Sequence, residues 1–174
     1  MEPIRLRIKD VVDRIDAQLR ELDRLTEEET PNQRRPPATP ERIAEFEGAI
    51  GMSLPADYRE FLLLHDGWEG FSGENALLSI EEMSSGPVFE SVQELQQNLL
   101  AAGQAGPGHG LVFEASYVTR ISYFDREAAK TSDRLDIVFW NRREIARYPS
   151  FLAYLQGYSE TLDKLIAEER EKLR

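Results

Sequence analysis

The chain has 174 residues, no cysteine and a formal net charge of −11, with 32 acidic and 21 basic residues. This length suits one domain with a sizeable core, and the lack of cysteine excludes disulfides, thiolate zinc sites and cysteine nucleophiles. The negative charge argues against nucleic acid and anionic membranes as partners, because both attract basic surfaces. A basic protein is therefore the expected partner.

Two further absences narrow the function. No apolar run reaches the roughly 20 residues that span a bilayer, and the N-terminus lacks the apolar stretch of a secretory signal. We therefore expect a cytoplasmic protein. The two histidines, His65 and His109, are too few for a multi-histidine metal centre, so we expect neither a metal nor a cofactor.

Residues 4–27 predict one long helix, because apolar side chains recur at spacings of three and four. These side chains are Ile4, Ile8, Val11, Val12, Ile15, Leu19, Leu22 and Leu25. Such a stripe favours a helix that docks on its own domain or pairs with a second helix. The alternative is a dimer seam, so we expect a monomer or a homodimer through this helix.

A proline-rich segment separates this helix from the rest of the chain. Residues 28–40 hold four prolines and show no apolar periodicity, which is typical of a linker or surface loop. We therefore divide the chain into an N-terminal helix (1–29), a proline-rich linker (30–38) and a main domain (39–174).

The main domain is predicted to begin with a helical hairpin. Thr39 can cap a helix and Pro40 fits its first position, while Gly51 can end it in the left-handed conformation. A second helix is predicted from Pro55 to Gly67, with its apolar side chains on one face. That face needs a cover, and a sheet is the expected one.

Strands cluster in the middle of the chain. Short runs rich in β-branched and aromatic residues predict strands at 76–80, 111–115, 118–124 and 135–140. The glycine-rich residues 103–110 predict a turn or loop, and the polar residues 125–134 predict a long hairpin connection.

Two more helices complete the pattern. A capping box from Ser91 to Glu94 predicts a helix that runs to about residue 102, and Ser150 or Pro149 starts a final helix with a broad apolar stripe. We expect an α+β fold with a mostly antiparallel central sheet covered by helices, including the long N-terminal and C-terminal helices.

The negative charge is concentrated in residues 37–100, which hold twelve acids and two bases. A solvated face is the ordinary explanation, but so local an excess also predicts a docking surface for a basic protein. Trp68 either anchors a partner or seals the end of the helical hairpin. The predicted partner-binding residues are Asp57, Asp66, Trp68, Glu69, Glu74, Glu81, Glu82, Glu90 and Glu94.

No catalytic site is predicted. His65 and Asp66 could form a base and its orienting carboxylate, but adjacent residues at a helix end rarely point the same way, and a favourable interaction of His65 with the helix dipole is preferred. The loop 106–110 lacks the lysine of a phosphate-binding loop. The acids between 125 and 136 do not fit the EF-hand spacing.

Several short motifs follow one another in a fixed order between about residues 38 and 158. They are Ile43-Ala-Glu-Phe-Glu47, Ile50-Gly51, Leu54-Pro55, Tyr58, Phe61-Leu62, Asp66-Gly67-Trp68, Ile80-Glu-Glu82, Tyr123-Phe-Asp125, Ile137-Val-Phe-Trp140 and Ser150-Phe-Leu-Ala-Tyr-Leu155. Their order and spacing resemble the SUKH superfamily, which groups fungal Smi/Knr cell-wall regulators with bacterial toxin-immunity proteins.

This resemblance implies a function without catalysis. The leading hypothesis is a cytoplasmic immunity protein that binds and neutralises a cognate bacterial toxin in interbacterial competition. A nuclease, with a basic substrate groove, would complement the acids of residues 37–100. The alternative is a regulatory or scaffold protein-binding module in the manner of the fungal members.

Overall fold

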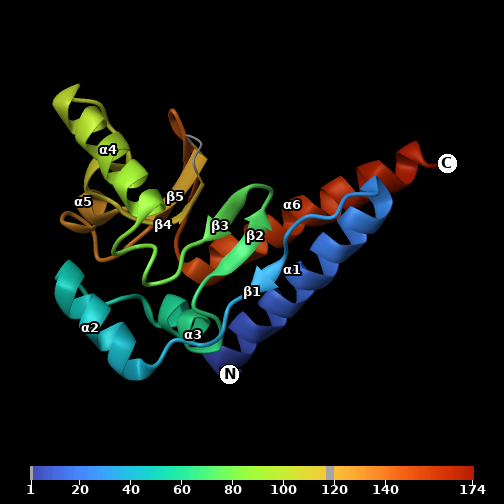
Figure 1. The fold of residues 1–174 in the computed structure, drawn as a ribbon, viewed down its shortest axis with the longest axis horizontal. Coiled ribbons are helices and arrows are strands. Elements are labelled where there is room, and N and C mark those ends of the chain that lie inside the picture. The colour runs from blue at the N-terminus through green and yellow to red at the C-terminus, as the bar shows by residue number, and fades with distance from the viewer. Residues whose placement is uncertain (1, 117–119) are drawn as a thin grey trace.

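A computed structural model describes residues 2–116 and 120–174. The fold is α+β, as expected, with helices around one antiparallel sheet (Figure 1). The elements in chain order are α1 (Ile4–Thr26), β1 (Gln33–Arg34), α2 (Pro40–Ile50), α3 (Ala56–Leu64), β2 (Trp68–Ser72), β3 (Asn75–Leu77), α4 (Pro87–Ala101), the short 3-10 helix η1 (Pro107–His109), β4 (Leu111–Ala115), β5 (Arg120–Phe124), α5 (Arg126–Ala129), β6 (Ile137–Asn141), β7 (Glu144–Tyr148) and α6 (Phe151–Lys172).

The sheet follows the chain. Within the described residues it has seven strands in the order β1 to β7, and every neighbouring pair is antiparallel. The expected antiparallel sheet is therefore confirmed. The longest regular register joins β5 and β6, where Ile121 lies opposite Trp140 and Phe124 opposite Ile137.

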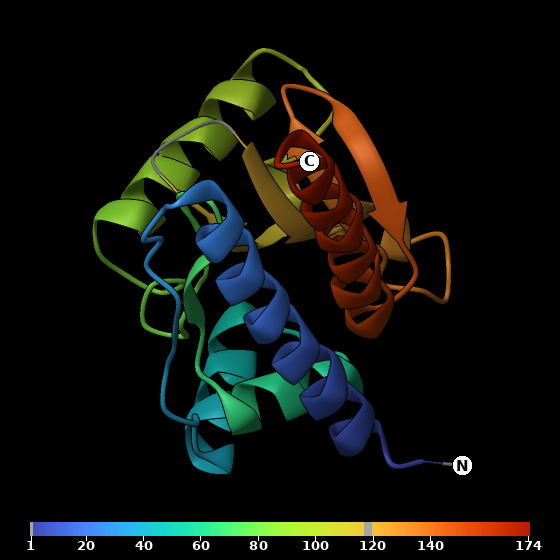
Figure 2. The ribbon, with the colours of Figure 1, turned by 90° about the vertical axis from the view of Figure 1, so that its right-hand side faces the viewer.

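The long helices α1 and α6 lie side by side and extend past the sheet in the same direction (Figures 1 and 2). Two ion pairs with the same sequence offset show that they run parallel, Arg14 with Asp163 and Glu21 with Arg170. The apolar stripe of α1 is buried against α6 and α3. The N-terminal helix is thus docked on its own chain, while the boundaries drawn at residues 29 and 38 stay a prediction.

An aromatic cluster joins the helical hairpin to the sheet and to α6. The ring of Tyr58 on α3 lies 5.0 Å from that of Phe124 on β5 and 4.9 Å from that of Phe151 on α6. Phe113 on β4 contacts the same rings. Burial of such large side chains is the main favourable contribution to folding, and it fixes α3 and α6 on the sheet.

Several predicted helix ends are confirmed. The Thr39 hydroxyl accepts a hydrogen bond from the Arg42 N–H, Gly51 is left-handed with φ of 68°, and Ser150 caps α6 through the Ala153 N–H. Two predictions were wrong. The helix predicted to end at Gly67 ends at Leu64, and α4 begins at Pro87 rather than at Ser91, because proline suits a first helical turn.

The strand predictions were partly right. β4 matches its predicted bounds, β6 is shifted by one or two residues, and the strand predicted at 76–80 ends at Leu77. Of the strand predicted at 118–124, residues 120–124 form β5, and 118 and 119 lie outside the described residues. The sequence did not reveal β1, β2 and β7. The predicted loops 103–110 and 125–134 contain η1 and α5.

Candidate partner-binding surface

Two of the nine predicted partner-binding residues are buried. Asp57 is 8% exposed, and its carboxylate accepts hydrogen bonds from the N–H groups of Tyr58 and Leu152. Trp68 is fully buried, donates its indole N–H to Asn32 at 2.7 Å and packs against the ring of Phe71. Both side chains are occupied within the fold, so neither is available to a partner on the surface.

Two other predicted residues are partly buried and already bonded. The Asp66 carboxylate accepts a hydrogen bond from the Ile80 N–H at 2.8 Å, and burial raises its pKa against that bond. Glu82 forms a bidentate ion pair with Arg35 and accepts a hydrogen bond from the Ser79 N–H. Burial alone would raise the pKa of Glu82, but these bonds outweigh it and lower the pKa.

The remaining five predicted carboxylates are exposed, and none bonds to another described residue; they are Glu69, Glu74, Glu81, Glu90 and Glu94. They do not form one patch. Glu69 and Glu74, on and after β2, line a hollow of about 630 Å³ with Glu28 and Glu29. We call these four residues the acidic hollow. Glu81 lies elsewhere, beside Arg35 and Arg42, and Glu90 and Glu94 lie on α4.

Glu28 and Glu29 were not among the predicted partner-binding residues, because they lie outside the acidic residues 37–100 from which those were taken. The pairing of β1 with β2 sets Gln33 opposite Glu69, and this pairing brings the end of α1 next to the β2–β3 turn. The run Glu27-Glu28-Glu29 was visible in the sequence. Strand β1, which places these carboxylates beside Glu69, was not predicted from the sequence.

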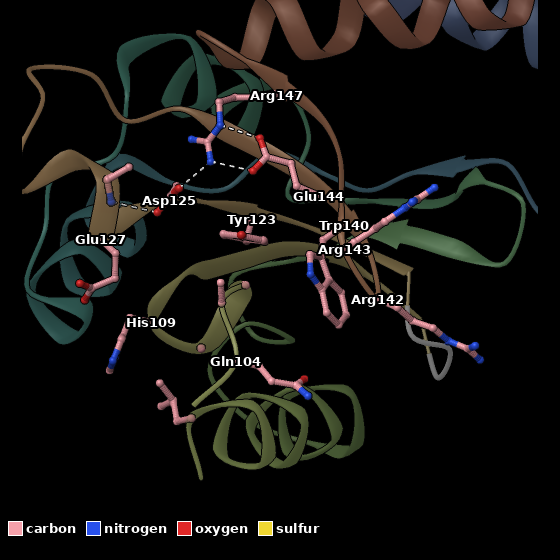
Figure 3. A pocket seen from close by; sticks show the side chains of 15 residues that line it. Gln104, His109, Tyr123, Asp125, Glu127, Trp140, Arg142, Arg143, Glu144 and Arg147 are labelled. Carbon is pink, nitrogen blue, oxygen red and sulfur yellow. Dashed lines mark hydrogen bonds and ion pairs between the residues drawn. The ribbon is translucent and has the colours of Figure 1, made fainter. Parts of the chain in front are cut away.

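A second hollow, of about 500 Å³, lies between η1, β5, α5 and the β6–β7 hairpin (Figure 3). Arg147 lies between Asp125 and Glu144 and donates hydrogen bonds to both, which raises its pKa. The guanidinium groups of Arg142 and Arg143 make no hydrogen bond or ion pair to a described residue, and Figure 3 shows their side chains extending away from Tyr123. The hollow's central charges are therefore already paired.

The titratable groups that the sequence suggested as a catalytic pair have separate partners in the structure. The His65 ring forms a hydrogen bond with the Arg35 carbonyl oxygen at 3.1 Å, and the Asp66 carboxylate accepts one from the Ile80 N–H. The two side chains therefore do not form the catalytic base and orienting carboxylate considered from the sequence. Among residues 2–116 and 120–174, no group of three or more metal-ligating side chains occurs. In that same part of the chain, no helix is both long and apolar enough to cross a membrane.

The model of the SMI1 / KNR4 family (SUKH-1) matches residues 37–157, which is more than half of the chain. The chain belongs to this family. The matched region runs from the end of the proline-rich segment into α6 and contains α2 to β7. It includes Glu69 and Glu74 of the acidic hollow but not Glu28 and Glu29.

A curated relative agrees with membership of the SMI1 / KNR4 family. This chain is 36% identical over 67 residues to the "Uncharacterized protein YnaB" of Bacillus subtilis (strain 168). The aligned stretch is 38% of this chain and 44% of that protein, so it spans less than half the length of the relative.

The motif residues that suggested the family from the sequence are architectural in the structure. Ile43, Leu54, Tyr58, Phe61 and Leu62 all lie in the core and are at most 4% exposed. The SMI1 / KNR4 signature thus specifies how α2 and α3 pack on the sheet. The exposed carboxylates Glu69, Glu74, Glu81, Glu90 and Glu94 lie outside this buried framework.

Proposed function

We propose that this chain is an immunity protein that binds and neutralises a cognate bacterial toxin in the cytoplasm. The observation that carries the proposal is the acidic hollow, in which four exposed carboxylates lie together without an ion pair to a described residue. Membership of the SMI1 / KNR4 family supports it. Inhibition by binding needs a complementary surface and no catalytic group.

The charge around the acidic hollow favours a basic toxin. Residues 60–119 contain no lysine or arginine, so the β2–β3 hairpin and α4 carry acids and no base of their own, although the Arg120 guanidinium from β5 bonds the Ser72 carbonyl. A nuclease has a positively charged groove for nucleic acid, and an acidic surface both steers toward such a groove and occupies it. We propose a nuclease as the toxin.

We also propose that the chain is a monomer before it binds the toxin. The apolar stripe of α1, considered above as a dimer seam, is covered by α6 and α3, and Leu6 is the large apolar side chain of this helix that stays exposed. Light scattering of the purified protein measures this directly. A concentration-independent dimer mass would contradict it.

The test uses the toxin domain encoded by the neighbouring open reading frame. We expect the two proteins to co-elute and the chain to inhibit the toxin stoichiometrically. Binding should weaken as salt rises from about 0.1 to about 1 M, because the screening length falls from about 10 to about 3 Å. Substituting Glu28, Glu29, Glu69 and Glu74 together by lysine should abolish protection.

A matched control has the same change in net charge at exposed, unpaired acids elsewhere, namely Glu41, Glu45, Glu168 and Glu171 replaced by lysine. This control should still protect. Equal protection by both variants would show that the acidic hollow is not the interface. Failure of the unmodified chain to bind or inhibit the toxin would reject the immunity proposal and favour the regulatory alternative.

A further inference from the structure

A cavity of about 430 Å³ opens between α1, α6 and the sheet, on the side where Figure 2 shows the two helices next to one another. Aromatic side chains from the sheet and from α6 form much of its wall. They are Phe71, Phe139, Tyr148, Tyr154 and Tyr158. A cavity of this size with mostly apolar walls and a few polar groups is typical of a binding site.

The buried end of this cavity holds the carboxylate of Glu114, on β4. Glu114 is 2% exposed, whereas Leu165, which also lines the cavity, is 39% exposed. The carboxylate accepts hydrogen bonds from the hydroxyls of Ser122 and Tyr154 and from the amide of Asn75. These three donors fix the position of the carboxylate at the wall of the cavity.

This buried carboxylate has no cationic partner among the described residues, since no lysine or arginine lies within ion-pair distance of it. Arg120, the cation that lines the cavity, instead donates to the Ser72 carbonyl at 2.9 Å. A cation that reaches a buried carboxylate interacts with it strongly, because little water screens the pair. The arrangement therefore leaves room for a cation from outside.

The walls also suit a cation. Burial and the charge of Glu114 raise the pKa of Tyr148, and they raise the pKa of Tyr154 well above its ordinary value. The tyrosines therefore stay neutral, and their ring faces attract a positive group. Ammonium and guanidinium groups are the cations that a protein partner carries.

The cavity adjoins the acidic hollow. Glu28, Thr30 and Gly73 line both, so one carboxylate of the acidic hollow, that of Glu28, also lines the cavity. A basic side chain of a partner docked on the acidic hollow would face this opening.

We propose that the cavity receives one arginine or lysine side chain of the toxin, with Glu114 as its counter-charge. This inference rests on the proposed function, because the toxin supplies the side chain. In such an interface, charged residues at the rim surround one side chain inserted into the cavity. A few buried residues of this kind supply most of the binding energy of a protein interface.

The first experiment tests the cavity without the toxin. The probe is n-butylguanidinium, with n-butylurea as its uncharged analogue of similar shape, and the readout is the NMR resonances of Tyr148 and Tyr158. We expect saturable shifts with the cation and at least about tenfold weaker binding both of the urea and of the cation to Glu114→Gln. Equal binding of both probes, or no shift with either, overturns the proposal.

Glu114→Gln removes an acceptor from a buried hydrogen-bond network and can therefore destabilise the fold. A second pair of variants changes exposed residues instead. Leu165→Trp fills the exposed side of the cavity, and Leu173→Trp places the same ring at an exposed position directly after the same helix, where Leu173 is 68% exposed. We expect Leu165→Trp to weaken toxin binding by at least about tenfold and Leu173→Trp to leave it unchanged.

The outcomes separate the two proposals. Normal toxin binding by Leu165→Trp would overturn the anchor and leave the immunity function standing. The anchor is supported if Leu165→Trp loses toxin binding, Leu173→Trp keeps it, and the cavity binds n-butylguanidinium more tightly than n-butylurea. If the unmodified chain binds no toxin, the immunity function fails, and the probe titration still decides whether the cavity selects cations.

Discussion

The carboxylate of Asp57, in the first turn of α3, accepts a hydrogen bond of 2.8 Å from the backbone N–H of Leu152, in the first turn of α6. The two residues lie 95 positions apart in the chain. A helix N-terminus has N–H groups without partners and a partial positive charge. Asp57 therefore satisfies the start of the closing helix from another element and holds α3 and α6 together.

Replacing Asp57 by alanine should destabilise the protein by about 1–3 kcal/mol, because the Leu152 N–H would stay buried without an acceptor. Asp57→Asn keeps an acceptor oxygen and should cost less. Urea unfolding measures both. A loss of toxin binding by a folded Asp57→Asn variant would instead return Asp57 to the interface that the sequence analysis assigned to it.

Two glycines allow the cost of a left-handed backbone conformation to be measured separately from the cost of a steric clash. Gly51 and Gly70 have nearly the same φ, 68° and 69°, but an added Cβ at Gly51 meets nothing within 4 Å, whereas at Gly70 it would lie 1.3 Å from the Pro31 carbonyl oxygen. Gly51→Ala should cost about 1–2 kcal/mol, the penalty of a left-handed alanine. Gly70→Ala should cost more than about 4 kcal/mol. Thermal unfolding measures both variants. Equal destabilisation by the two would contradict the close approach of the Pro31 carbonyl to Gly70.

His65 should make folding stability depend on pH between about 7 and 5. Partial burial lowers its pKa below the ordinary value of 6.5, although the hydrogen bond to the Arg35 carbonyl acts in the opposite direction. The unfolded chain therefore takes up the proton first, so the stability contributed by neutral His65 is present above pH 6.5 and is lost as pH falls through the lowered pKa.

The control for this dependence is His65→Gln, which lacks the titrating ring. We expect the unmodified protein to lose more unfolding free energy than the variant between pH 7 and pH 5, as measured by urea titration at each pH. An NMR titration of the ring that gave a pKa above 6.5 would contradict the assignment.

Removing residues 1–29 tests the division of the chain into helix, linker and domain. The deletion exposes the faces of α3 and α6 that α1 covers and removes five buried apolar side chains, Ile8, Val11, Val12, Ile15 and Leu19. Each contributes about 1.5–3 kcal/mol, against a typical domain stability of about 5–15 kcal/mol. We expect residues 30–174 alone to lack a cooperative unfolding transition.

Point variants provide the control for this deletion. Ile8 is fully buried and Leu6 is 47% exposed on the same helix. Ile8→Ala should cost about 2–5 kcal/mol, and Leu6→Ala should change stability by less than about 1 kcal/mol. A truncated chain that unfolds cooperatively would support residues 39–174 as an independent domain.

Long periodic segments made much of the fold predictable from the sequence. The stripe from Ile4 to Leu25 and the caps at Thr39 and Ser150 are local signals, and the structure has them where they were expected. The strands β1 and β7 were missed for a physical reason. β1 is two residues long, and the residues of β7, Glu-Ile-Ala-Arg-Tyr, do not alternate between apolar and polar, so neither carries a strong pattern of its own.

The partner-binding surface was less predictable, because local composition does not tell which acids the fold uses. Asp57 and Glu82 belong to the same acidic segment as Glu69 and Glu74, but the first two bond within the chain and the last two do not. Glu114 was overlooked because it reads as one residue of a β-strand. Its lack of a counter-charge is visible only when the strands and α6 are assembled.

The contact between α1 and α6 also constrains the order in which the chain can fold during synthesis. The sheet pairs each strand with its neighbour in the chain, so hairpins can form one after another as they leave the ribosome. The apolar stripe of α1 is synthesised before every strand of the sheet, but most of its cover is α6, which is synthesised after all of the described strands. The nascent chain therefore carries a partly uncovered apolar helix until α6 has left the ribosome, and chaperones that recognise such stripes can bind it in that interval.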